Sequence, residues 1–288
     1  MHSIENKFLR ISTKEQGAEL TSIFKMSSKK EYLWQAEAAF WGRHAPVLFP
    51  IVGRLKDDQY YIGKKAYSMK QHGLARNLDF SMIRNDGYSI IFELKATPET
   101  LKQYPFPFLL NIQYTLKEND LIVYYRVTNP AKTALYFSIG GHPAFNCPIH
   151  KGTKRSDYQL VFDKKETAKT QRLTNGIRNN KTTAILKKEQ VLKIKKTLFD
   201  EDALVFENLK SNKVCLQKGK KKVLTFDFKG FPYLGIWSKN QEAPFVCIEP
   251  WYGIADKENH NQQLSEKEGI IKLNGKESFD CYYAITIH

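Results

Sequence analysis

Short stretches of alternating apolar and polar residues recur along the chain. Residues 8–11 and 18–24 alternate with period two, and residues 89–94 and 111–116 are further candidates of this type. A period of two is typical of a β-strand, because successive side chains point to opposite faces of the sheet. Residues 59–67 contain two such runs joined at Gly63-Lys64, which predicts a tight hairpin.

Strand patterns continue to the end of the chain, and only one helix is predicted. Thr97 is a suitable N-cap with Pro98 at the first helical position, and the helix should end near Tyr104, before a proline-rich segment. Many short strands and scarcely any helix predict an all-β fold, a large antiparallel sandwich or barrel with one or two short helices. We find no linker or repeat, so we expect one domain over residues 1–288. The later predicted strands are 121–128, 134–139, 203–206, 214–216, 223–228, 233–237, 245–249 and 281–287.

The composition supports an all-β fold and also indicates the cellular compartment. Hydrophobic residues make up 42% and aromatic residues 13% of the chain, enough for a packed core rich in sheet-favouring side chains. No run approaches the roughly 20 apolar residues of a membrane helix, and the N-terminus lacks a signal-peptide core. The four cysteines form no close pair, so neither a CxxC metal site nor a disulfide framework is indicated. We therefore expect a cytoplasmic protein with reduced thiols, no membrane partner and no metal or redox cofactor.

The net charge of +15 is concentrated in one segment. Residues 164–198 hold eleven basic and two acidic residues, and they contain no aromatic residue. A platform for single-stranded nucleic acid normally offers stacking aromatics beside its basic groups. We therefore interpret this segment as a solvated flap or edge hairpin and expect no nucleic-acid partner. Lysine-rich edges also discourage aggregation between sheets.

Two residues stand out as candidates for acid–base chemistry. His142 lies between Gly141 and Pro143 at the end of a predicted strand, where it is either a catalytic group or a structural histidine. Glu249 ends an apolar strand before Pro250, and partial burial there would raise its pKa and make it a stronger base. Because proline cannot donate to a ladder, we expect the strand to end at this point. The two residues should come from different strands and oppose each other across a concave face.

An irregular segment adds to these candidates. Residues 40–54 are apolar but contain two prolines, two glycines and two arginines, which fits neither a regular strand nor a helix. Loops of this kind often carry function. Arg54 near its end could bind a ligand or simply pair with Asp57 or Asp58.

Taken together, four motifs resemble the aldose 1-epimerase (galactose mutarotase) family, in particular its bacterial LacX-like branch. Segments 202–206 and 233–237 fit the same branch, and the resemblance runs from about Phe8 to Ile287. It implies a large antiparallel β-sandwich, in agreement with the strand pattern. The motifs are Gly53-Arg54, Gln71-His72-Gly73, Gly140 to Asn146, and Ile248-Glu249-Pro250-Trp251.

The resemblance also implies an activity and roles for single residues. It implies that Glu249 is the general base and His142 the general acid of a mutarotase that opens and closes a free hexose such as galactose or glucose. Such chemistry needs no cofactor. The resemblance further puts substrate-binding roles on a set of four residues: Arg54, His72, Asp202 and Trp237.

Each of these roles has a plainer alternative. Asp202 could be one solvated charge among Asp200-Glu201-Asp202, and Trp237 could belong to the core. The same acid and base would also suit a hexose-6-phosphate 1-epimerase, with Arg43 and Arg76 as the phosphate grip. A carbohydrate-binding sandwich without catalysis is a third possibility. The sequence leaves open whether the protein is a monomer or a homodimer.

Overall fold

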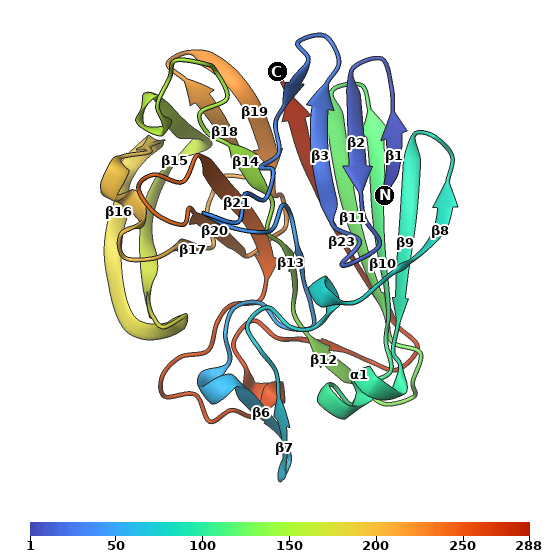
Figure 1. The fold of residues 1–288 in the computed structure, drawn as a ribbon. Coiled ribbons are helices and arrows are strands. Elements are labelled where there is room, and N and C mark those ends of the chain that lie inside the picture. The colour runs from blue at the N-terminus through green and yellow to red at the C-terminus, as the bar shows by residue number, and fades with distance from the viewer.

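The computed structural model describes residues 1–288, and almost all of the regular structure is antiparallel β-sheet. One sheet has 15 strands and runs through most of the chain, and a second sheet has four strands in the order β1-β2-β3-β4. Figure 1 shows this smaller sheet at the N-terminus lying against β9, β10, β11 and β23 of the large sheet. The predicted β-sandwich is confirmed. The four strands are β1 (His2–Glu5), β2 (Leu9–Thr13), β3 (Leu20–Lys25) and β4 (Lys30–Glu31).

The large sheet follows the order β5-β13-β21-β20-β17-β15-β18-β19-β23-β11-β10-β9-β8, with β14 paired to β21 and β16 paired to β15. Its strands in the first half of the chain are β5 (Val47–Leu48), β8 (Ser81–Asn85), β9 (Ser89–Lys95), β10 (Leu109–Lys117), β11 (Asp120–Thr128), β13 (Ile139–Gly141) and β14 (Ala144–Asn146). Those in the second half are β15 (Tyr158–Thr174), β16 (Ile177–Lys193), β17 (Leu204–Glu207), β18 (Lys213–Lys218), β19 (Lys221–Asp227), β20 (Tyr233–Trp237), β21 (Phe245–Tyr252) and β23 (Ser278–Ile287).

Two small elements confirm local predictions. The strands β6 (Gln59–Ile62) and β7 (Lys65–Ser68) form the expected hairpin around Gly63-Lys64. Helix α1 (Pro98–Gln103) begins after Thr97, whose side chain accepts a hydrogen bond from the Thr100 amide. Five short 3-10 turns complete the helical structure, at Lys56–Asp58, Ala75–Asn77, Arg155–Asp157, Lys196–Phe199 and Leu264–Glu266. None of these helices has the length and apolar character needed to span a membrane.

Part of the core lies between the two sheets. Alternate residues of β2 and β3, such as Ile11 and Ile23, are fully buried in the same cluster as Phe92 of β9. Tyr114 of β10 donates a hydrogen bond of 2.7 Å to the Ala18 carbonyl, which ties the large sheet to the segment before β3. The period-two pattern seen in the sequence is therefore the burial pattern of a sandwich.

Among the differences from the predicted strand boundaries, two lie beside His142 and Glu249. The run 134–139 is divided at Ser138 into β12 (Leu135–Phe137), which pairs with β22 (Ile271–Leu273), and β13, which joins the large sheet. The buried Ser138 amide donates instead to the Pro50 carbonyl, so the chain changes sheets there. The prediction that a strand ends at Glu249 was also wrong, because β21 continues through Pro250 to Tyr252.

Candidate active site

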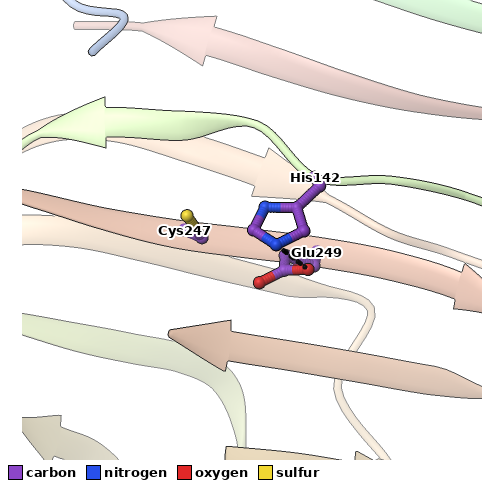
Figure 2. A group of neighbouring side chains, drawn as sticks. All are labelled: His142, Cys247 and Glu249. Atoms are coloured by element: carbon purple, nitrogen blue, oxygen red, sulfur yellow. Dashed lines mark ion pairs between the residues drawn. The ribbon is translucent and has the colours of Figure 1, made fainter. Parts of the chain in front are cut away.

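The strand pairing places His142 directly opposite Glu249. On one side of His142, Gly140 of β13 pairs with Trp251 of β21, and on the other side Ala144 of β14 pairs with Cys247. The same register holds on both sides, so the interruption at 142–143 faces Glu249. Figure 2 shows the imidazole standing over the Glu249 carboxylate on the neighbouring strand. The two groups are cross-strand neighbours. They therefore lie closer together than we expected, because the sequence predicted only that they oppose each other across a concave face.

The interruption also explains how a proline is tolerated inside β21. The Ile248 amide donates to the Pro143 carbonyl at 3.2 Å, so Ile248 directs its N–H toward β13 and β14. Alternate residues of an antiparallel strand direct their N–H groups to the same side. The N–H that Pro250 lacks would therefore point toward the interrupted strand, where few ladder hydrogen bonds are formed in any case.

His142, Glu249 and Trp251 together form the floor of the site, and two glycines make room for the Trp251 indole. A Cβ on Gly140 would lie 2.7 Å from Cδ1 of Trp251, and a Cβ on Gly235 of β20 would lie 2.5 Å from its Cζ2. The Trp251 ring therefore lies flat across the neighbouring strands β13 and β20. Only glycine allows this close approach.

The two candidate catalytic groups are buried and in contact. His142 Nε2 lies 3.2 Å from Glu249 Oε2, with side-chain exposures of 9% and 2%. Burial, with a smaller contribution from Asp202, raises the pKa of Glu249 well above its usual range, while the nearby Trp251 indole opposes the shift. Burial, together with Arg76 and Arg43, lowers the pKa of His142 to about 3. Both effects favour the neutral forms of the two side chains, a protonated carboxyl and an unprotonated imidazole.

Two aromatic residues and a second histidine hold the His142 ring. The Trp41 indole stacks on it with ring centroids 4.8 Å apart, and Trp237 meets it edge-on at 5.6 Å. His72 also makes an edge contact with His142 at 5.6 Å, and its Nδ1 accepts a hydrogen bond from the Gly53 amide at 3.1 Å. Burial lowers the pKa of His72 well below its usual value, so its single ring proton lies on Nε2. His72 is therefore a neutral hydrogen-bond donor.

These residues line one pocket of about 610 Å³, and all six predicted site residues belong to it. The irregular segment 40–54 contributes Trp41, Gly53 and Arg54, as the loop interpretation anticipated. Asp202 lies at the start of the Ala203–Val205 wall, and its Oδ1 accepts a hydrogen bond from the Ala203 amide. The pocket lies within the size range of sites for small molecules.

Arg54 is in the pocket but is already paired. Its guanidinium binds both Asp58 carboxylate oxygens at 2.8 and 2.9 Å and donates to the Asn175 carbonyl at 3.0 Å. Both readings of Arg54 thus apply, because it forms an ion pair with Asp58 and also faces the pocket. The pairing fixes the orientation of the guanidinium toward any ligand.

One wall of the pocket was not predicted from the sequence. Leu173, Asn175 and Gly176 come from the tip of the long β15–β16 hairpin, which is the basic segment predicted as a solvated flap. The hairpin itself is confirmed, but its tip is part of the pocket. Other lining residues that were not predicted as binding groups include Trp41, Gln71, Lys239 and Trp251. Arg76, considered in the sequence only as part of a phosphate grip, also lines the pocket. Gln71 and Trp251 stand inside motifs that the sequence had already singled out, whereas no local signal marked the hairpin tip.

A further cluster was not foreseen from the spacing of the cysteines. Cys247 projects from β21 on the same face as Glu249, and Figure 2 shows its thiol beside the His142 ring. Potential ligand atoms of His142, Cys247 and Glu249 all lie within 4.8 Å of one another. Metal-ligand sets are often recognised by their close spacing in the sequence. Here the strand pairing brings together residues that are more than a hundred positions apart.

Comparisons with known proteins agree with this fold. A family model described as aldose 1-epimerase matches residues 1–268. The chain is 34% identical to the plasmid-encoded protein LacX of Lactococcus lactis subsp. lactis, over 99% of this chain and 98% of that protein. A galactose mutarotase related enzyme from Lactobacillus acidophilus superposes with a TM-score of 0.95 at 36% identity, covering 100% of this chain and 97% of that one. A galactose mutarotase-like protein from Lactobacillus casei gives a TM-score of 0.92 at 32% identity, with both chains fully covered. The chain therefore belongs to the aldose 1-epimerase family, a family of isomerases.

Proposed function

We propose that this protein interconverts the α and β anomers of a free hexose, such as galactose or glucose, by acid–base opening of the ring. The observation that carries the proposal is the buried contact of 3.2 Å between His142 Nε2 and Glu249 Oε2. It lies in a pocket of about 610 Å³ that also offers hydrogen-bonding groups for hydroxyls.

The proposed reaction moves two protons in opposite senses. Glu249 takes the proton of the anomeric hydroxyl while His142 gives a proton to the ring oxygen, the C1–O5 bond breaks and C1 becomes an aldehyde. Rotation about the C1–C2 bond presents the other face of the aldehyde. In closure, His142 takes the proton back from O5 and Glu249 returns its proton to O1. Each group thereby regains its starting state without water.

The protonation of the pair suits this exchange of roles. In the sugar-free pocket the pKa shifts of both groups favour a protonated Glu249 beside a neutral His142, which is the arrangement reached halfway through the proposed cycle. A sugar hydroxyl near the carboxylate would favour its ionised form and move the proton to His142. Because the pair is neutral overall in both arrangements, the proton moves without a net charge entering the buried site.

The same pocket supports binding roles for the other predicted residues. The Nε2–H of His72 is a donor for a ring or hydroxyl oxygen, and the Asp202 carboxylate can accept from a pair of hydroxyls. Arg54, held by Asp58, is a further donor. The Trp237 ring offers an apolar surface for the C–H face of a sugar.

The test measures anomer exchange of galactose and glucose by NMR, with the native chain and with His142→Gln and Glu249→Gln. We expect each variant to lose roughly 10²- to 10⁴-fold in turnover, since each removes one acid–base group. Glu258→Gln is the matched control, because Glu258 is exposed and outside the pocket. Rates that never exceed those of buffer, with saturable sugar binding, would identify a binding module instead.

A hexose-6-phosphate 1-epimerase is the second candidate, and Arg76 favours it. Arg76 lines the pocket, forms no ion pair, and its Nε has no hydrogen-bond partner. Burial and the neighbouring Arg43 lower the pKa of Arg76 to about 10, which an anionic group would offset. Glucose 6-phosphate in the same assay separates the two candidates. Exchange of the phosphorylated sugar alone would overturn the free-hexose proposal.

A further inference from the structure

Cys247 is a buried nucleophilic group at the active site that the proposed mechanism does not use. It lies two residues before Glu249 on β21, and because side chains alternate along a strand, both project from the same face. Figure 2 shows the thiol, the imidazole and the carboxylate converging from β21 and the segment before β14. All three residues are buried.

The three side chains form a donor set that suits a thiophilic metal ion. One nitrogen, one sulfur and one oxygen lie within 4.8 Å of one another, and the distance between His142 Nε2 and Glu249 Oε2 is 3.2 Å. Zinc bonds of about 2.0–2.3 Å require ligand atoms roughly 3.3–3.7 Å apart, so the cluster needs to contract by about 1 Å. Three protein ligands and an open position are the arrangement of zinc sites that keep a place for water.

Two buried atoms of the cluster have no hydrogen-bond partner. These are Nδ1 of His142 and Oε2 of Glu249, although Oε2 lies near the imidazole. Buried polar atoms without partners are rare in folded proteins. His142 and Glu249 line the pocket and Cys247 does not, so an ion would reach the cluster through the pocket, by the route of the sugar.

We propose that His142, Cys247 and Glu249 bind one thiophilic divalent cation, Zn²⁺ or Cd²⁺, and that metal binding and sugar turnover exclude each other. Metal binding forms a metal–sulfur bond and breaks the S–H bond, with the thiol proton passing to water. The proton held by the His142–Glu249 pair leaves as well. Two protons are thus exchanged for one dication, and the charge of the buried site does not change. The metal site rests on geometry alone, and only its effect on turnover rests on the proposed function.

The plainer account is that Cys247 is a packing residue. It is in contact with the apolar cluster that includes Trp34, Ala144 and Phe245. Buried thiols are often inert, and this account predicts no metal binding at micromolar concentration. The two accounts therefore make opposite predictions for a metal titration.

The test titrates the full-length reduced chain with Cd²⁺ and follows the ultraviolet charge-transfer absorption of a cadmium–thiolate bond. We expect one tightly bound Cd²⁺ per chain. Cys247→Ser, and Cys247→Ala should the serine variant fail to fold, should lose this absorption and weaken binding by roughly 100-fold, as expected for loss of one of three protein ligands. Cys215→Ser is the matched control because Cys215 is the most accessible thiol, and it should keep the absorption.

Turnover is the second measurement. Zn²⁺ should inhibit the native chain in competition with the sugar, and inhibition of Cys247→Ser, relative to its own metal-free rate, should need roughly 100-fold more Zn²⁺. Absence of the thiolate absorption in the native chain, or its persistence in Cys247→Ser, overturns the metal site. Absorption without any sugar turnover under metal-free conditions would instead overturn the proposed function and leave the metal site standing.

Discussion

The floor and the hairpin wall of the pocket are built in different ways. The floor consists of His142, Glu249 and Trp251, which are held by backbone pairing between β13, β21 and β20 in the interior of the large sheet. The wall is the tip of the β15–β16 hairpin, which reaches the pocket far from the pairing of β15 with β18. The comparison indicates that the chemical groups depend on strand register, whereas the wall depends on side-chain bonds together with a few isolated backbone contacts.

Arg178 is the main anchor of the wall. This fully buried arginine donates to the Ala255 carbonyl at 2.8 Å and makes two hydrogen bonds of 3.0 Å to Glu268. Its backbone also pairs with the chain around Lys257. On the pocket side, the Asn175 carbonyl accepts from Arg54. The tip is thus attached by two arginines, one behind the wall and one at the pocket.

The largest expected effect is on the floor. In Gly140→Ala the added methyl group would meet Trp251 Cδ1 at 2.7 Å and the Pro250 carbonyl at 2.9 Å, so β13 and β21 must separate. We expect kcat to fall roughly 10- to 100-fold, since a shift of about 1 Å in a catalytic group is costly. Gly42→Ala is the control, because no atom lies within 4 Å of the position that its added methyl group would take, and the backbone at Gly42 does not have a positive φ. Equal rates for both variants would show that the floor tolerates movement.

A smaller effect is expected at the wall. Arg178→Gln removes the bonds to Glu268 and loosens the tip, while leaving His142 and Glu249 in place. We expect KM for the sugar to rise about tenfold and kcat to change less than twofold. The reason is that the wall would bind the sugar equally well in the ground state and in the transition state, so its loss weakens binding without slowing the chemical step. Lys169→Gln removes the same charge from an exposed site on the same hairpin and should leave KM unchanged. A fall in kcat with unchanged KM would contradict the division into floor and wall.

The smallest effect concerns stability in acid. The hydrogen bonds from Arg178, together with Lys257, lower the pKa of Glu268 from its usual 4.5 to about 2. A lowered pKa in the folded state stabilises the protein above pH 4.5, and this contribution is lost as the pH falls toward 2. Because Glu268 is 37% exposed, we expect only about 1 kcal/mol.

Urea unfolding of the native chain and of Glu268→Gln checks this expectation. The difference in free energy of unfolding should be present at pH 6 and should disappear between pH 4.5 and 2, because Glu268 becomes neutral there in both states. If the difference in the free energy of unfolding persists at pH 2, it comes from packing and not from ionisation of Glu268.

Much of the site was predictable because its residues carry local signals. Glycine and proline around His142, and proline after Glu249, mark backbone positions where a regular ladder is interrupted. His72 beside Gly73 belongs to the same class, and a Cβ on Gly73 would come within 2.2 Å of the Phe49 carbonyl. Arg178 has no comparable signal, since in the sequence it is one basic residue among many.

Most of the strand-forming segments, the capped helix and two candidates for acid–base chemistry were predictable from the sequence, because these depend on side-chain period and on glycine and proline chemistry. Tertiary structure decided which strands pair and in what register. That register places His142 against Glu249, carries β21 through Pro250, brings Cys247 beside the pair and folds the basic hairpin tip into the pocket. The physical reason is that a period of two specifies the face of a strand but not its neighbour, which depends on the combined packing of segments distant in the chain.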